Sequence, residues 1–233
     1  MNMETAGGEV TFPTVDAAAV LERVVAVQAR IAELAAGRSV RIVAVTKSFG
    51  HDAVAAAVAA GLTAIGENYA QELIAKAAAG AGGERVRWHF IGAIQRNKVA
   101  QLAPFVAIWE SVDRPAAADA IARHSPGASA LVEVNLAGDP HRTGCAWGDT
   151  EAVVDAGRRA GLTVVGLMGL GLAPAPDPAL FARLATLADR LGLPECSMGM
   201  SADYEIAVTE GATMVRLGTA LFGPRPPARD LRR

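Results

Sequence analysis

A lysine stands at the end of a stretch of sequence that is typical of a buried strand. Residues 40–45 are apolar apart from Arg41, and β-branched side chains recur among them. With the two-residue period of a strand, Val43, Val45 and Lys47 share one face, and both faces are largely apolar, as in a parallel strand covered on both sides. Burial disfavours the charged form of an amine, and the neutral form attacks carbonyl groups. Lys47 is therefore a candidate for forming an imine; the alternative is a lysine that extends from a strand end into solvent.

Two glycine-containing motifs near the end of the chain could bind a phosphate group. Ser201 precedes a predicted helix, where its hydroxyl and the first backbone amides can bind an anion, and Gly199 allows a close approach of the backbone. Gly218 and Thr219 repeat this arrangement after the last predicted strand. A simple helix cap is the alternative for Ser201. Two such motifs on neighbouring strands favour a phosphate-binding cup more strongly than either motif alone.

Three further polar side chains follow or interrupt predicted strands. Arg216 lies within an otherwise apolar strand, and an unpaired buried guanidinium is costly, so it must have an acceptor. That acceptor could be a structural carboxylate such as Glu133 or an atom of a bound ligand. Asn68 and Asn135 could orient a ligand by hydrogen bonds, or they could cap their own loops.

An imine-forming lysine and a phosphate cup at one site indicate a ligand that carries both an aldehyde and a phosphate. Pyridoxal 5′-phosphate (PLP) is the common cofactor with both groups. A sugar phosphate bound by a Schiff-base aldolase is the competing interpretation.

The elements that must position these residues alternate regularly along the chain. A helix capped by residues 14–16 is expected to run to about Ala36. The predicted strands cover residues 40–47, 62–66, 86–91, 105–109, 128–135, 162–168, 195–198 and 213–217. The predicted helices cover residues 51–60, 67–79, 94–102, 114–124, 150–160, 178–191 and 202–210, with a further start near Ala220. Eight strand–helix units predict a single (β/α)8 TIM barrel with an extra N-terminal helix, and sites in such barrels lie where the strands end.

The domain organisation expected from this pattern is simple. We expect residues 1–13 to form an irregular leader and residues 14–233 to form one barrel. A doubly wound open sheet is the nearest competitor. Its GxGxxG signature is absent after the first strand, and the glycine-rich residues 166–171 have the wrong spacing.

The composition of the chain argues against several kinds of binding partner. The net charge of −2 gives no general attraction for nucleic acid or an anionic membrane. The start of the chain lacks signal-peptide features, and no apolar run reaches membrane-spanning length, so we expect a cytoplasmic protein. Cys145 and Cys196 are expected to be reduced, buried residues. The four histidines are dispersed without metal-ligand spacing, and His89 is expected to be a core or supporting residue, so no metal site is predicted.

Seven segments of the sequence resemble signatures of the pyridoxal phosphate homeostasis proteins. They occupy residues 43–47, 66–72, 88–92, 95–98, 166–168, 197–203 and 214–223. The resemblance implies a barrel like the N-terminal domain of alanine racemase, with PLP bound as an imine on Lys47. It further implies that Ser201, Gly218 and Thr219 contact the phosphate and that Arg216 faces the pyridine nitrogen. The full set of expected cofactor-binding residues is Lys47, Asn68, Met168, Ser201, Arg216, Gly218 and Thr219.

One segment departs from the family pattern. In residues 139–144, Arg142 occupies a position where a lysine is common, which leaves the role of this loop open.

The resemblance implies a non-enzymatic carrier or regulator of vitamin B6, and the residues support this. A charged arginine opposite the pyridine nitrogen disfavours its protonation and weakens the electron sink that PLP enzymes use. Racemases of this type also use a tyrosine from a second subunit, whereas Tyr69 and Tyr204 belong to the barrel itself and no second domain follows residue 223. We therefore expect a monomeric binder with no catalytic residue and without efficient turnover. Its expected partners are B6 vitamers, with PLP-dependent apoenzymes as candidate recipients. A minimal racemase or decarboxylase, the aldolase and a purely structural barrel are the alternatives.

Overall fold

The computed structural model describes residues 12, 14–171 and 177–224. The expected leader, residues 1–13, therefore lies almost wholly outside the described residues, as do residues 225–233. The division of the chain into leader and barrel stays a prediction.

Eight parallel strands form a closed ring. Their bounds are β1 (Arg41–Val45), β2 (Ala64–Glu67), β3 (Arg87–Phe90), β4 (Val106–Val112), β5 (Ser129–Val134), β6 (Thr163–Gly169), β7 (Glu195–Ser197) and β8 (Met214–Leu217). Each strand pairs with the next, and β8 pairs with β1 and so closes the barrel. The predicted TIM barrel is confirmed.

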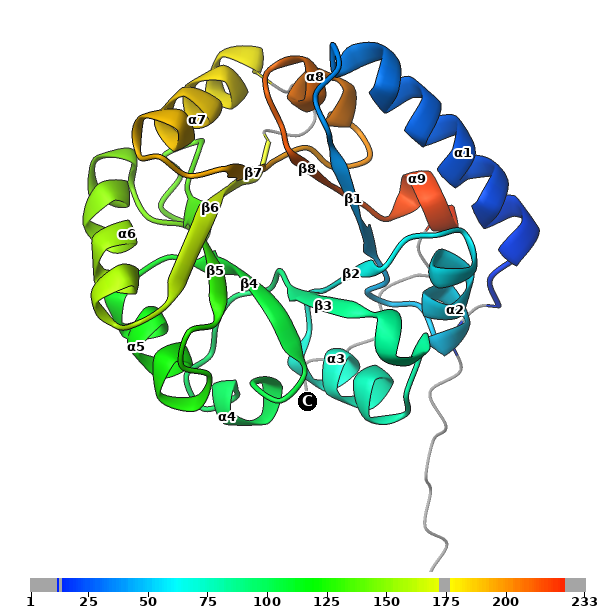
Figure 1. Ribbon diagram of the computed structural model, residues 1–233, viewed down its shortest axis with the longest axis horizontal. Coiled ribbons are helices and arrows are strands. Elements are labelled where there is room, and N and C mark those ends of the chain that lie inside the picture. The colour runs from blue at the N-terminus through cyan, green and yellow to red at the C-terminus, as the bar shows by residue number, and fades with distance from the viewer. Residues whose placement is uncertain (1–11, 13, 172–176, 225–233) are drawn as a thin grey trace, which may run out of the picture.

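Helices surround the strands, as Figure 1 shows in a view through the ring. Their bounds are α1 (Ala17–Leu34), α2 (His51–Ala59), α3 (Ala70–Ala78), α4 (Val99–Leu102), α5 (Pro115–His124), α6 (Thr150–Arg159), α7 (Pro178–Arg190), α8 (Tyr204–Thr209) and α9 (Thr219–Phe222). Short 3-10 turns occupy Gly83–Arg85 and Trp147–Asp149. Each strand is thus followed by a helix, but the helix after β8 has only four residues.

The extra N-terminal helix, α1, is confirmed and completes the outer layer where α9 is short. The carboxylate of Asp16 caps it by accepting hydrogen bonds from the amides of Ala18 and Ala19. Its apolar stripe is buried, and the helix lies beside α2, α8 and α9 (Figure 1). The buried members of the stripe are Val20, Val24, Val27 and Ile31.

The apolar residues form two separate layers. A large cluster fills the space between the barrel and the helices, and it includes Ile42 and Ala44 of β1. A small cluster inside the barrel contains Val43, Ile108, Leu131, Met168 and Met214. The alternation predicted for β1 is therefore confirmed, with Val43 facing the interior. Cys145 and Cys196 are buried free thiols, also as predicted.

Three boundaries differ from the predictions in ways that matter for the site. β1 ends at Val45, so Lys47 lies in a turn beyond the strand. β2 continues through Glu67, which was predicted to begin a helix, because a buried lysine compensates its charge. β4 continues past Trp109 to Val112 and so includes Glu110, whose carboxylate contacts the ring of His89.

Two further helices begin later than predicted in ways that matter for the site. The helix expected from Ile94 begins only at Val99, after a turn in which residues 95–97 are exposed. The helix expected from Ala202 begins at Tyr204, so Ser201 is not its first capping residue.

Candidate functional site

Lys47 lies in a tight turn that follows β1 at the carboxyl-terminal mouth of the barrel. The turn is closed by a hydrogen bond from the amide of Phe49 to the carbonyl of Thr46, 3.1 Å long. Ser48 adopts the left-handed conformation, with φ of +68°, which is uncommon for a residue other than glycine. The amide of Thr46 donates to the carbonyl of Gly66 at 3.1 Å and continues the pairing with β2. Lys47, which is half-buried, is thus presented from a fixed backbone.

The two motifs predicted to bind phosphate lie in contact with each other. The hydroxyl oxygen of Ser201 accepts hydrogen bonds from the amides of Gly218 (3.3 Å) and Ala220 (3.1 Å). Gly218 is buried against β1, since a Cβ atom at this position would lie 3.3 Å from the carbonyl oxygen of Val45. The loops after β7 and β8 therefore meet beside the end of β1, two residues before Lys47.

Gly199 has the backbone role predicted for it. Its φ of +92° is in the region that favours glycine, and a Cβ atom would lie 2.6 Å from the Cβ of Ala207. The close approach of the loop to α8 therefore requires a glycine. The carbonyl of Gly199 accepts from the amide of Arg216 at 2.9 Å, which ties this loop to β8.

Arg216 is buried at the interior of the barrel and has acceptors from two other strands. One terminal nitrogen, Nη1, donates to both the carbonyl and the hydroxyl of Ser197 at 2.7 Å, and Nη2 donates to the carbonyl of Gly169 at 2.7 Å. Glu133, which was predicted as one possible acceptor for Arg216, does not accept a hydrogen bond from it. The carboxylate of Glu133 accepts instead from the hydroxyl of Thr143, 2.5 Å away, and acts on Arg216 only through its charge.

A buried polar chain continues from Arg216 across the barrel. The hydroxyl of Ser197 donates to Oε2 of Glu110 at 2.6 Å, and Oε1 of Glu110 lies 2.5 Å from Nδ1 of His89. Burial alone would raise the pKa of Glu110. This effect of burial is outweighed by the hydrogen bond and charge of His89, the charge of Arg216 and the hydrogen bond from Ser197. The pKa of Glu110 therefore lies below its usual value. Glu110 is therefore an anion that balances the buried guanidinium.

The remaining expected site residues lie around and beneath the mouth. Asn68 follows β2 and is half-buried; its carbonyl is so close to the next loop that a Cβ on Gly92 would lie 1.9 Å away. Met168 lies in the apolar cluster inside the barrel. Thr219 is exposed at the start of α9.

Asn135 caps its own loop, as one of the two alternatives predicted. Its side-chain amide donates to the carbonyl of Asp139 at 2.7 Å and to that of Arg142 at 3.4 Å. Arg142, the departure from the family pattern, donates to the carbonyl of Gly171 at 3.2 Å and so joins the loops after β5 and β6.

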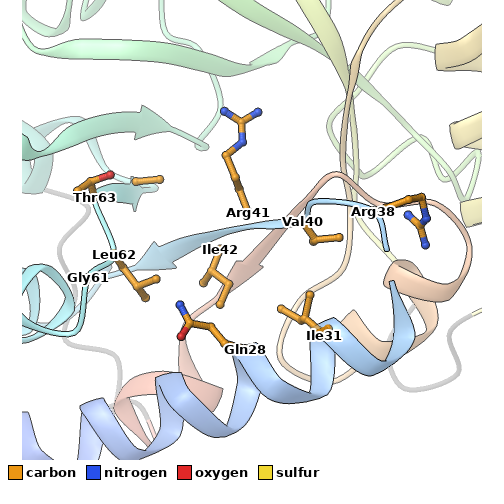
Figure 2. Close-up of a pocket in the computed structure, with 11 residues that line it drawn as sticks. Gln28, Ile31, Arg38, Val40, Arg41, Ile42, Gly61, Leu62 and Thr63 are labelled. Carbon is orange, nitrogen blue, oxygen red and sulfur yellow. The ribbon is translucent and has the colours of Figure 1, made fainter. Parts of the chain in front are cut away.

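A hollow of about 360 Å³ lies at the end of the barrel where the strands begin. Figure 2 shows residues that line it, among them Gln28, Ile42 and Leu62. It is lined by α1 and by residues at the amino ends of β1 and β2. Arg38 at its edge is bound to the carbonyls of Val208 and Ala212. Because none of the expected ligand-binding residues lines it, this hollow is separate from the candidate site.

Some chemically relevant residues were not predicted. Glu110 carries the counter-charge of Arg216, and Glu67, Glu72 and Lys76 form a buried ionic cluster next to Lys47. A single acidic residue within the apolar run 106–112 was the available signal for Glu110. Within the described ranges, no group of three potential metal ligands occurs and no helix is long and apolar enough to cross a membrane.

The closed barrel and the residues at its carboxyl-terminal mouth match a known class of protein domain. Residues 15–226 match the family described as the N-terminal domain of alanine racemase. The alanine racemase of Corynebacterium glutamicum shares this fold, with a TM-score of 0.67 at 19% identity over 92% of this chain and 64% of that one.

More similar relatives narrow the class. The pyridoxal phosphate homeostasis protein of Pseudomonas aeruginosa is 41% identical over 88% of this chain and 96% of its own length. The protein of that name from Deinococcus radiodurans is 42% identical over 83% and 95%. The structure of PipY from Synechococcus elongatus with PLP bound superposes with a TM-score of 0.76 at 31% identity, over 88% of this chain and all of that one. The chain belongs to the family of pyridoxal phosphate homeostasis proteins.

Proposed function

We propose that the protein binds PLP as an imine on Lys47 and takes part in the intracellular homeostasis of this cofactor. The observation that supports the proposal is the close approach of Gly218 to the carbonyl of Val45, because Val45 lies two residues before Lys47 and Gly218 belongs to the loop proposed to bind the phosphate. Membership of the family, and a relative whose structure holds PLP, support it.

The residues at the mouth suit the chemical groups of PLP. We propose that Ser201, Gly218 and Thr219 contact the phosphate; the hydroxyl oxygen of Ser201 accepts from the amides of Gly218 and Ala220, so these residues lie together. Arg216 is proposed to face the pyridine nitrogen, and Asn68 and Met168 are proposed to lie beside the ring. When bound, PLP supplies an aldehyde for the imine and an electron-withdrawing ring.

We infer that turnover is inefficient. Arg216 is held in place by Ser197 and Gly169; burial lowers its pKa, which the charges of Glu110 and Glu133 counteract. A guanidinium stays protonated in proteins, and a charge there opposes protonation of the pyridine nitrogen. Tyr69 is 40% exposed before α3, and Tyr204 begins α8. Neither tyrosine is proposed as an acid or base, and no catalytic residue is assigned.

The proposal extends to the oligomeric state of the protein, its location and its partners. We infer a monomer in the cytoplasm that binds B6 vitamers and passes PLP to PLP-dependent apoenzymes. The names of the relatives support the link to PLP homeostasis. Transfer is measured by mixing the loaded protein with such an apoenzyme and following the recovery of its activity.

The imine is tested by absorbance and by mass spectrometry after borohydride reduction. The chain has three lysines, Lys47, Lys76 and Lys98, so a phosphopyridoxyl group can be assigned without ambiguity. We expect a visible absorbance band and modification of Lys47. The Lys47→Ala variant should lose both, and Lys98→Ala, which changes a half-buried lysine just before α4, should keep both.

Two results would contradict the proposal. A colourless protein that borohydride traps only with a sugar phosphate would indicate an aldolase. Sustained racemisation of amino acids, well above the rate with free PLP, would overturn the inference of inefficient turnover.

A further inference from the structure

A buried ionic cluster lies directly behind the turn that carries Lys47. It consists of Glu67 at the end of β2 and of Glu72 and Lys76 on α3, and it is called the Lys76 cluster here. The amine of Lys76 donates to Oε1 of Glu67 at 2.5 Å and lies 3.5 Å from Oε2 of Glu72. The side chains of Lys76 and Glu67 are 3% and 0% exposed. Because Glu72 and Lys76 are four residues apart, they project from the same face of α3.

The cluster holds the backbone on both sides of Lys47. On one side, Lys76 donates to the carbonyl of Thr46 at 2.8 Å, and the hydroxyl of Thr46 donates to Glu67 at 2.6 Å. On the other side, the amide of Ser48 donates to Oε2 of Glu72 at 2.8 Å. Thr46 and Ser48 are the two chain neighbours of Lys47. The cluster therefore fixes the peptide groups from which the side chain of Lys47 extends.

A gain in folding stability does not by itself explain why the charges of the Lys76 cluster are buried. Burying charges costs free energy, and a well-packed apolar set in the same volume is often as stable or more stable. The Lys76 cluster places two carboxylates against one amine, and Oε2 of Glu67 and Oε1 of Glu72 have no hydrogen-bond partner among the described residues. Burial raises the pKa of Glu67 to about 7, so the cost of its charge is not fully offset. What the cluster does achieve is the left-handed turn at Ser48, which strain would otherwise disfavour.

We propose that the Lys76 cluster positions Lys47 for reaction with the carbonyl group of its ligand. Glu67, Glu72 and Lys76 are positioning residues, since they act through Thr46 and Ser48 and do not touch the ligand. The inference rests on the proposed function, in which Lys47 forms an imine with PLP.

The test separates imine formation from binding of the phosphate. The triple variant Glu67→Gln/Glu72→Leu/Lys76→Met removes all three charges at once and leaves none of them unpaired. Two probes are used: PLP, followed by stopped-flow absorbance of the imine, and 4′-deoxypyridoxine 5′-phosphate, which has the phosphate and ring but no aldehyde. We expect imine formation to slow at least about tenfold, because misplacement of a reacting group by about 1 Å can cost on the order of 100-fold. Binding of the deoxy analogue should change by less than about twofold.

A control variant and a milder variant complete the design. Thr213→Val removes a hydroxyl that bonds to Glu195 and to the amide of Cys196 at the opposite end of the barrel. It should lower stability and leave the rate of imine formation unchanged. Glu72→Ala releases only the Ser48 side of the turn and keeps the pair of Glu67 and Lys76, so it tests the proposal should the triple variant not fold. We expect it to slow imine formation about threefold, as for loss of one hydrogen bond of about 0.6 kcal/mol.

Each outcome is decisive. Imine formation at the wild-type rate in a folded variant would overturn the inference, as would an equal loss of affinity for the deoxy analogue. An absence of the imine band in the wild-type protein would instead contradict the proposed function.

Discussion

Replacing Glu110 by glutamine removes the negative charge at the centre of the barrel without changing the size of the side chain. Glu110 is completely buried between His89 and Ser197, and its charge acts on Arg216. Removing one partner of a buried charge set costs about 3–5 kcal/mol, because the other charge stays buried. Glutamine can still accept the hydrogen bond from Ser197, so we expect the lower end, about 3 kcal/mol.

Urea unfolding followed by circular dichroism at pH 7 measures this loss. In a chain of this size, a loss of about 3 kcal/mol corresponds to a fall of roughly 6–12 °C in the unfolding temperature. The matched control is Glu84→Gln, which makes the same chemical change at an exposed position. It should stay within about 0.5 kcal/mol of the wild type.

The pH dependence gives a second check with a defined sign. The pKa of Glu110 is lowered in the folded protein, so its charge contributes stability above the usual carboxyl pKa of 4.5 and loses that contribution as the pH falls through the folded value. The difference between wild type and Glu110→Gln should therefore shrink in acid. A variant as stable as the wild type at pH 7, or a difference that grows in acid, would refute the assignment of Glu110 as a buried anion.

Two further predictions concern the mouth and the Lys76 cluster. Ser201→Ala should weaken PLP binding about two- to tenfold in a fluorescence titration, because one hydrogen bond contributes about 0.5–1.5 kcal/mol. The matched change Ser125→Ala should leave binding unaltered. Equal affinity of the two variants for PLP would show that Ser201 does not contact the phosphate. Burial raises the pKa of Glu67 from 4.5 to about 7, so its contribution to stability is present below pH 4.5 and is lost as the pH rises through about 7. The stability of Glu67→Gln relative to wild type should therefore rise over this range in urea titrations, and a pH-independent difference would contradict the shift.

The barrel could be predicted because its signals are local. Apolar runs separated by amphipathic helices recur eight times, and the alternation in β1 correctly assigned Val43 and Ile42 to opposite faces; the structure shows that Val43 faces the interior. The residues after β1, β7 and β8 could also be selected in advance, since parallel strands in a barrel end at one face. The strands β7 and β8 are neighbours in the ring, and Ser201 therefore lies close enough to bond to the loop of Gly218.

The buried charges could not be predicted, because the sequence does not show that both partners of a pair are buried. A charged residue at the end of an apolar run usually marks a surface, so nothing in the sequence indicated that Glu67 belongs to β2. The cost of burying its charge is partly offset by Lys76 of the following helix and by Thr46, just after β1. Glu110 likewise depends on His89 and Arg216, which reach it from β3 and β8. The partners of Glu110 lie on other strands, so only the closed barrel explains its burial.

The place of α1 in the outer layer has a consequence for how the chain is made. This helix precedes β1 in the chain, yet Arg23 within it donates to the carbonyl of Leu221, 198 positions later, and Arg30 pairs with Glu205. Its apolar stripe packs on α2 and also beside α8 and α9, so it is fully covered only after α9 has been made. Contacts between such distant segments form slowly, and exposed apolar surface in the meantime invites aggregation. The loop of Gly218 leads directly into α9, so competence to bind a ligand appears only after α9 has been made.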